Sequence, residues 1–173
     1  MARAQDGDPA AFEALVRHHQ TRLFRFVVRM TRDRGDAEDV IQDTWVTVWR
    51  RLPTLTDRDA FQPWLYQIGY RQALAVLRAR SRRDTPTPDT GLEPPTSEAG
   101  PQQRSEDYAR QRSLDTLVAE LPVDLRACWV LTEVNGLTYP ETAQALGVPV
   151  STVRGRIARA RHQLAEGMDP WRP

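Results

Sequence analysis

Four arginines recur on a predicted helix near the C-terminus, at Arg154, Arg156, Arg159 and Arg161. No acidic residue stands between them. A guanidinium group matches both the phosphate oxygens of DNA and the O6/N7 edge of guanine, so a cluster of this kind favours a DNA contact. An ordinary solvated helix face could also carry these charges, and the choice between the two interpretations depends on the surrounding elements.

Residues 137–164 have the organisation of a helix-turn-helix, a motif that would place these arginines in a major groove. Thr138 and Glu141 form a capping box, which predicts where the first helix begins. Gly147 provides the residue at which that helix can end, and a second helix begins near Val150. Because the capping box, the glycine turn and the acid-free helix coincide, the segment predicts DNA binding.

A second group of polar side chains lies on a predicted helix over residues 36–52, which we expect to be capped at Gly35-Asp36. One face of this helix is acidic and amide-bearing, and two apolar residues border it. That face comprises Asp39, Gln42, Asp43, Val46 and Trp49. The pattern is compatible with solvation and a favourable charge near a helix N-terminus, and equally with a docking surface for a basic partner helix.

A third predicted helix, over residues 60–83, begins with aromatic residues and ends in a run of arginines. The aromatic positions are Phe61, Trp64, Tyr66 and Tyr70, and the arginines are Arg71, Arg78, Arg80, Arg82 and Arg83. Aromatic rings stack on unpaired bases while cations follow the backbone, so this order favours single-stranded or partly melted DNA. Core packing is the alternative for the aromatic residues, and we expect Phe61 and Trp64 to face inward at least in part.

These helices predict an all-α protein of two small helical domains joined by a flexible, proline-rich linker. The domains cover residues 1–83 and 105–173, and the linker covers residues 84–104, which lack apolar periodicity. The first domain opens with an apolar helix over about residues 8–31. The second opens with a helix pair split at Pro122, and the helix-turn-helix completes it.

The composition excludes several other classes of protein. The chain has 173 residues, a formal net charge of +1 and no lysine. No apolar run approaches the roughly 20 residues that cross a bilayer, so we expect no membrane insertion. Cys128 is the single cysteine and is expected to be buried in a protein of the reducing cytoplasm. We expect His18 and His19 to be surface residues, and no metal site, cofactor or catalytic constellation is indicated, so no enzymatic activity is expected.

The order of these parts is more specific than any one of them. The segments DAEDVIQDTWVTVW, FQPWLYQIGYRQALAVLRARSRR and LPVDLRACWVLTEVNGLTYPETAQALGVPVSTVRGRIARARHQL follow one another along nearly the whole chain. In this order they resemble a bacterial extracytoplasmic-function (ECF) RNA polymerase sigma factor of the sigma-70 superfamily. The resemblance implies that residues 1–83 are sigma domain 2, which binds core polymerase and opens the minus-10 element. Residues 105–173 would then be sigma domain 4, which reads the minus-35 element.

The resemblance also assigns roles to individual residues. The beta-prime clamp helices of core RNA polymerase would be bound by Asp39, Gln42, Asp43, Val46 and Trp49, while domain 4 would face the beta flap. The loop over residues 52–60 corresponds to the segment that captures a flipped base. Minus-10 DNA would be contacted by Trp64, Gln67, Tyr70, Arg71, Arg78, Arg80, Arg82 and Arg83. Minus-35 DNA would be contacted by Ser151, Thr152, Arg154, Gly155, Arg156, Ala158 and Arg159.

The third helix departs from the family pattern. Members of the family commonly read I-A-R-N after the Trp-Leu pair and place an aspartate four residues beyond the asparagine. This chain has Ile68-Gly69-Tyr70-Arg71 and then Ala75. The usual minus-10 contacts therefore do not carry over at Tyr70 and Arg71. Gly155 stands where a small polar residue is frequent, and it costs the helix roughly 1 kcal/mol against alanine.

Together these features predict a promoter-specificity subunit with core RNA polymerase and promoter DNA as its partners. Many members of the family are held inactive by an anti-sigma factor, so such a protein is a further candidate partner. The main alternative is a free-standing helix-turn-helix transcriptional regulator, which would bind duplex DNA without polymerase. An enzyme lacks a workable set of catalytic residues here, and a pure protein adaptor would leave the arginine clusters without a purpose.

Overall fold

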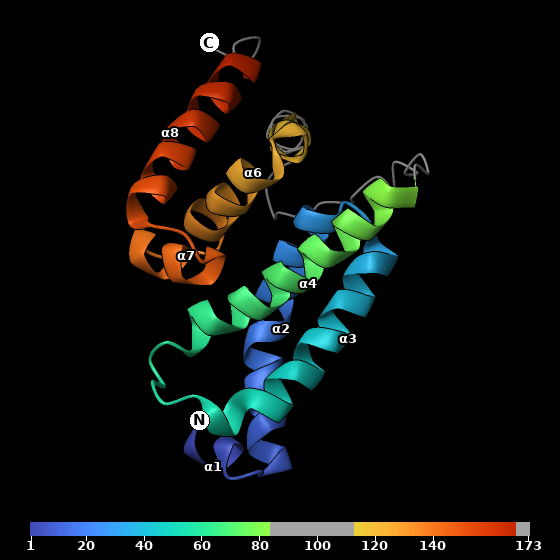
Figure 1. The fold of residues 1–173 in the computed structure, drawn as a ribbon, viewed down its shortest axis with the longest axis vertical. Helices are drawn as coiled ribbons and strands as arrows, with labels where there is room; N and C mark the ends of the chain where they lie inside the picture. Colours follow the sequence, from blue (N-terminus) through green and yellow to red (C-terminus); the bar gives the residue numbers. More distant parts are fainter. Residues whose placement is uncertain (84–112, 169–173) are drawn as a thin grey trace, which may run out of the picture.

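The computed structural model describes residues 1–83 and 113–168. Within these two ranges every regular element is a helix and no strand occurs, which confirms the predicted all-α class. The helices form two groups, one from each range (Figure 1). No helix in these ranges combines the length and the apolar character needed to cross a membrane.

Three long helices make up the first group: α2 (Pro9–Thr31), α3 (Arg34–Arg51) and α4 (Phe61–Arg83). The short α1 (Ala2–Gln5) precedes them, and a 3-10 turn, η1 (Leu52–Thr54), follows α3. In Figure 1, α2, α3 and α4 lie side by side, and α1 lies at the end of the bundle farthest from the second group. The predicted helix over residues 8–31 and the predicted helix over residues 60–83 are thus both present.

The N-terminal caps explain where the first two long helices begin. The Asp8 carboxylate accepts hydrogen bonds from the backbone N–H groups of Ala10 and Ala11, at 2.9 and 3.1 Å. The predicted cap of α3 at Gly35-Asp36 is wrong. The cap is Asp33, whose extended backbone leaves its carboxylate free to accept the Asp36 N–H at 2.9 Å, so Gly35 lies inside the first turn.

The core of the first group lies between the three long helices. Leu23, Phe26 and Met30 of α2 are fully buried, as is Leu65 of α4. A Cβ added to Gly69 of α4 would lie 3.2 Å from Leu23 Cδ1, which is tighter than ordinary side-chain contacts. The glycine that departs from the family pattern therefore allows α2 and α4 to pack closely.

The second group consists of a helix over residues 113–120, α6 (Val123–Trp129), α7 (Tyr139–Leu146) and α8 (Val150–Gly167). Pro122 separates the first two, as predicted. A short π-helical segment, η2 (Val130–Val134), continues α6 and closes with a hydrogen bond from the Asn135 N–H to the Val130 carbonyl at 2.9 Å. Cys128 is buried in this group, as predicted.

Candidate nucleic-acid and protein interfaces

The helix-turn-helix forms as its caps predict. The Thr138 hydroxyl accepts the Glu141 backbone N–H at 3.3 Å, and the Glu141 carboxylate accepts the Thr138 backbone N–H at 2.8 Å. Gly147 ends α7 with a φ of +68°, and the Val148 N–H donates to the Ala143 carbonyl at 3.0 Å. Because a left-handed backbone favours glycine, Gly147 lets the chain turn tightly into α8.

One face of α8 presents most of its predicted DNA-reading residues to solvent. The exposed residues are Ser151, Arg154, Gly155, Ala158 and Arg159, and Thr152 beside them is half-buried. They recur three or four residues apart, the spacing of a single helical face. A Cβ on Gly155 would meet nothing within 4 Å, so packing inside the protein does not require a glycine there.

The other two arginines of α8 pair with acids inside the second group. Arg156 Nη2 lies 2.6 Å from Asp124 Oδ2, and the Arg156 side chain is only 16% exposed. Arg161 Nη2 lies 2.9 Å from Glu133 Oε1. The four arginines that the sequence groups together therefore divide, and Arg154 and Arg159 are the two on the exposed face.

The acidic face of α3 is exposed over its full length. Asp39, Gln42 and Asp43 face solvent, and Val46 and Trp49 are 45% and 39% exposed. The Trp49 ring is nevertheless held in place, because its centroid lies 4.7 Å from that of an edge-on phenylalanine of α2. Large apolar side chains left exposed beside carboxylates are typical of a protein interaction surface.

The loop that follows α3 is held by α1, a short helix that was not among the predicted elements. The Gln5 side-chain amide donates to the carbonyl oxygens of Leu52 and Leu55, at 3.2 and 2.7 Å. The Gln5 side-chain oxygen accepts the Arg58 Nε–H at 2.8 Å. A single glutamine of α1 thus contacts the predicted base-capture loop at three of its residues.

The aromatic residues at the start of α4 belong largely to the core. Phe61 and Tyr66 are buried, and Trp64 is partly buried. The inward packing of Phe61 and Trp64 was expected. Tyr70 is only 6% exposed, although the resemblance places it among the minus-10 contacts. Burial, with a smaller effect of the nearby Asp124, raises the pKa of the Tyr70 hydroxyl to about 12, so it stays protonated.

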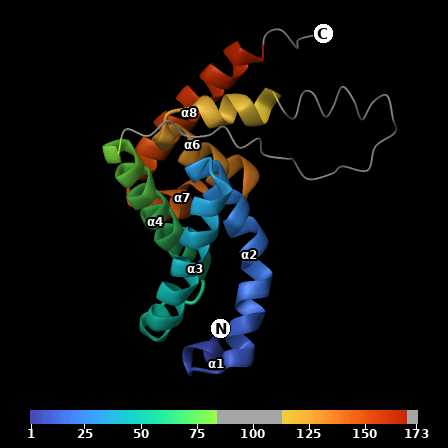
Figure 2. The same cartoon turned by 90° about the vertical axis from the view of Figure 1, so that its right-hand side faces the viewer.

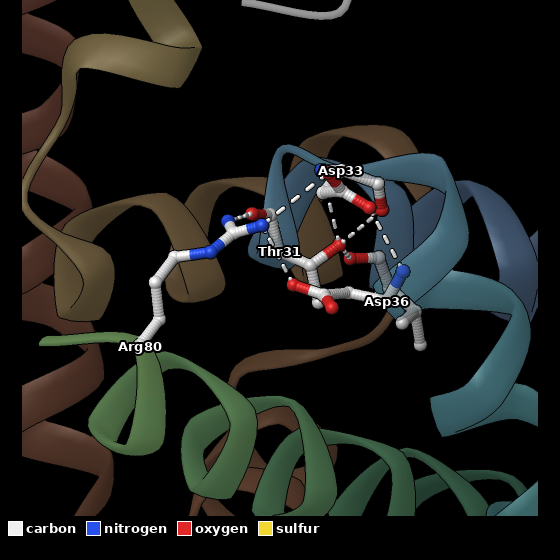
Figure 3. Close-up of polar contacts among 5 residues, drawn as sticks. Thr31, Asp33, Asp36 and Arg80 are labelled. Carbon is white, nitrogen blue, oxygen red and sulfur yellow. Dashed lines mark hydrogen bonds and ion pairs between the residues drawn. The ribbon is translucent and has the colours of Figure 1, made fainter. Parts of the chain in front are cut away.

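The arginines of α4 are not equivalent. Arg71, Arg78 and Arg82 are exposed, and the side chain of Arg83 lies outside the described residues. Arg80 instead points into the turn between α2 and α3 (Figure 3). Its guanidinium donates to the Thr31 carbonyl at 3.1 Å and lies 3.3 and 2.8 Å from carboxylate oxygens of two aspartates, Asp33 and Asp36.

Arg80 therefore stabilises the bundle. It satisfies a carbonyl at the C-terminal end of α2, where the helix dipole favours a cation, and it joins that end to the start of α3. The Arg80 contact and the Asp33 cap together lower the pKa of the Asp33 carboxyl, the cap to the Asp36 N–H being the larger cause.

The histidine prediction holds for only one of the two residues. His18 is exposed, but His19 is partly buried, with its ring centroid 5.2 Å from that of Phe61. Burial lowers the pKa of His19 to about 4, with further contributions from His18 and Arg22, so the ring is neutral at pH 7. No group of three potential metal ligands occurs in the two described ranges.

Two polar residues outside the predicted site lie where the two groups of helices meet. Asp124 accepts from the Tyr70 hydroxyl and also pairs with Arg156. Arg126 is 6% exposed and donates to the Ala119 and Met30 carbonyls. Their neighbours in sequence look like an ordinary amphipathic helix, so only the placement of distant elements identifies them.

Sequence profiles of two families match the chain. Sigma-70 region 2 matches residues 15–83, and Sigma-70, region 4 matches residues 111–164. The RNA polymerase sigma-H factor of Pseudomonas aeruginosa is 32% identical over 97% of this chain and 91% of its own length. The ECF RNA polymerase sigma-E factor of Escherichia coli is 32% identical over 97% of this chain and 92% of its own length.

A solved structure also matches. CnrH, in complex with the cytosolic domain of CnrY, aligns with a TM-score of 0.72 and 29% sequence identity. The alignment covers 98% of this chain and 94% of the CnrH chain.

Proposed function

The chain belongs to the sigma-70 family and, within it, to the ECF RNA polymerase sigma factors, and from this premise we propose how its residues divide the work of reading a promoter. The family consists of specificity subunits that direct transcription initiation. Residues 1–83 are assigned to core polymerase binding and to the minus-10 element. Residues 105–173 are assigned to the minus-35 element, and residues 84–104 connect the two.

The exposed face of α8 is proposed to read the minus-35 element. Arg154 and Arg159 project from it, and each guanidinium can form a bidentate contact with a guanine or a phosphate. The glycine between them leaves the backbone open on that side, which supports a close approach of DNA to Gly155. Arg156 joins this surface only if it leaves Asp124.

The exposed face of α3 is proposed to bind the beta-prime clamp helices of core polymerase. Its carboxylates complement a basic partner, and the apolar surface of Val46 and Trp49 provides area to bury. This face is the observation that best supports a polymerase subunit over a free-standing regulator, because a regulator that binds DNA alone has no need for it.

The minus-10 element is proposed to contact the exposed edge of α4 and the loop over residues 52–60. Arg71, Arg78 and Arg82 supply the cations that follow a DNA backbone. Arg80 does not contact DNA in this proposal. It holds the C-terminal end of α2 and the start of α3 in place beside this edge. Trp64 is partly exposed and is the aromatic residue best placed to meet an unstacked base.

An anti-sigma factor is proposed as a further partner. The structural relative CnrH is a protein in complex with the cytosolic domain of CnrY. In this proposal an anti-sigma factor of this chain would bind the polymerase-binding face of α3. A protein that covers Val46 and Trp49 would compete directly with core polymerase.

Transcription with purified core polymerase tests the function. We expect the protein to direct initiation from a subset of a genomic promoter library, and to shift promoter DNA in a gel only when core polymerase is present. Tight and specific binding of duplex DNA without polymerase would instead support the free-standing regulator. Absence of both activities would overturn the proposed function.

A further inference from the structure

The loop between α3 and α4 is held from one side by the short helix α1. α1 lies at the same end of the bundle as η1 and this loop (Figures 1 and 2). Gln5, the last residue of α1, donates its side-chain amide to the carbonyl oxygens of Leu52 and Leu55, at 3.2 and 2.7 Å. Its side-chain oxygen accepts the Arg58 Nε–H at 2.8 Å. One side chain therefore contacts the loop near the end of α3 and again just before α4.

The three contact points are themselves fixed to the bundle. Leu52 is fully buried, and the partly buried Leu55 packs against the core. The Leu52 carbonyl also accepts the Leu55 N–H at 3.1 Å. The Arg58 carbonyl accepts the Phe61 N–H at 3.2 Å, at the start of α4. The loop is thus attached at both ends, and Gln5 joins the two attachments to each other.

The residues between and beside these attachments face solvent. Thr56, Asp57 and Asp59 are exposed, and Asp57 Oδ1 accepts the Asp59 backbone N–H at 3.0 Å, which makes a compact turn at the tip. A hydroxyl and carboxylates can hydrogen-bond the edge of a base. Such contacts discriminate between bases only when the loop keeps one conformation, so the position of the tip decides how sharply a base is read.

α1 is in turn anchored to α2. Ala4 is only 2% exposed, and Arg3 Nε donates to Asp8 Oδ2 at 2.8 Å. The Asp8 side chain also caps α2, and its backbone N–H donates to the Arg3 carbonyl at 2.9 Å. Gln5 therefore projects from a helix that is fixed to the bundle, and it can hold the loop in one place.

We propose that Gln5 is a positioning residue for minus-10 recognition, whose three hydrogen bonds hold the loop over residues 52–60 in the conformation that receives an unstacked base. The inference rests on the proposed function, which assigns this loop to the minus-10 element. Gln5 itself does not contact DNA. A loop that is ordered before binding loses less entropy on binding, and its contacts favour the base that fits them. Gln5 therefore sets how sharply one base is distinguished, and it leaves core polymerase binding unchanged.

Binding of single-stranded minus-10 DNA to the holoenzyme tests this role. The holoenzyme contains the full-length chain and core polymerase, and the probes are fluorescent nontemplate-strand oligonucleotides of a promoter that it transcribes. Each probe has one minus-10 base replaced, and discrimination is the ratio of its dissociation constant to that of the original oligonucleotide. Gln5→Ala should lower this ratio about 5-fold at one minus-10 position and change it by less than about 2-fold at the others.

A substitution of equal size separates the hydrogen bonds from the bulk of the side chain. At pH 7, Gln5→Glu keeps an acceptor for Arg58 but has no donor for the Leu52 and Leu55 carbonyls. We therefore expect Gln5→Glu to lose discrimination at the same position as Gln5→Ala. Full discrimination in Gln5→Glu would overturn the proposal, because the two carbonyl contacts would then be dispensable.

Matched controls separate positioning from a purely structural role. Asp6→Ala changes the exposed residue next to Gln5, and Gln20→Ala removes the same side chain from an exposed position of α2. Neither should change discrimination at any position. Urea unfolding measures the stability of each variant. Lower stability of Gln5→Ala together with an equal loss of affinity for every oligonucleotide would overturn the positioning role.

The outcomes also distinguish the two proposals. If the unmodified holoenzyme discriminates between minus-10 bases and the Gln5→Ala holoenzyme does so equally well, the positioning role is overturned and the proposed function stands. If the unmodified holoenzyme does not prefer the minus-10 strand to a scrambled oligonucleotide, the minus-10 assignment fails, and the role of Gln5 fails with it. A loss at one position in both Gln5 variants, with unchanged affinity for core polymerase, supports the proposal.

Discussion

At the scale of single residues, the guanidinium groups of α4 and α8 divide into those paired with carboxylates and those that face solvent. Arg80 and Arg156 each lie within 3 Å of an acid and are mostly covered, whereas Arg78 and Arg154 are exposed; Arg161 pairs with Glu133 but stays exposed. An arginine held between carboxylates and a helix end contributes to folding, and its removal leaves several polar groups without a partner. An exposed arginine contributes little to folding and is available to DNA.

Substitution of Arg80 tests this division. We expect Arg80→Ala to lower the free energy of unfolding by about 1–2 kcal/mol, because Asp33, Asp36 and the Thr31 carbonyl lose a shared donor. Arg78→Ala on the same helix should change it by less than about 0.5 kcal/mol. Urea unfolding with an unchanged m-value measures the difference. Equal effects of the two substitutions would contradict the assignment of Arg80 as a stabilising residue.

Substitutions on α8 test the proposed minus-35 contacts. Arg154→Ala and Arg159→Ala should each reduce transcription from minus-35-dependent promoters about 10-fold, which corresponds to the 1–3 kcal/mol of a bidentate arginine–guanine contact. Arg161→Ala is the matched control, since Arg161 pairs with Glu133. Run-off transcription and a direct binding assay with core polymerase measure the two activities. Reduced affinity for core polymerase in either variant would count against the assignment.

At the scale of elements, caps and apolar periodicity predict most of the helices. The capping box at Thr138 and the glycine at residue 147 predict both ends of α7, since these signals act within a few residues. The start of α3 is less predictable, because Asp33 and Asp36 are both suitable caps and only the extended backbone at Asp33 decides between them. The π-helical segment after α6 has no simple signal in the sequence.

The candidate site is predictable where it depends on one helix face and unpredictable where it depends on two domains. The exposed face of α3 follows from residue spacing along a single helix. The pairing of Arg156 with Asp124 and the burial of Tyr70 depend on which distant helices meet. Spacing within one helix therefore identifies Arg154 and Arg156 equally, although only Arg154 is exposed.

The α3 face supports a prediction about an entire element. The double variant Asp39→Ala/Asp43→Ala should lower the affinity for core polymerase about 10-fold, because it removes the charges that complement a basic partner helix. Glu38→Ala is a suitable control, since Glu38 lies on the same helix and pairs with Arg34. Fluorescence titration of labelled protein with core polymerase measures the affinity. Unchanged affinity in the double variant would exclude this face as the docking surface.

At the scale of the whole molecule, the two groups of helices are in contact: α4 packs against α7, and Tyr70 of α4 is buried. The contact between the domains joins α4 to α7 and also includes the buried Arg126 of α6, which donates to the Met30 carbonyl of α2. Neither domain needs tight DNA binding alone, because polymerase holds both at one promoter and their modest affinities add.

The shared contact predicts cooperative unfolding of the two domains. We expect one calorimetric transition for the unmodified protein, because α2 and α6 stabilise each other through the Met30 carbonyl and Arg126. Arg29 Nη2 of α2 lies 3.3 Å from Asp115 Oδ1 in the helix over residues 113–120, so Arg29→Asp should split or broaden this transition, and the double swap with Asp115→Arg should merge it again. Raising the salt concentration should act in the same direction as the single swap, since a partly exposed ion pair is screened. Two separate transitions in the unmodified protein at low salt would show that the domains unfold independently. The contact between them, including the burial of Tyr70, would then add nothing to the stability of either domain.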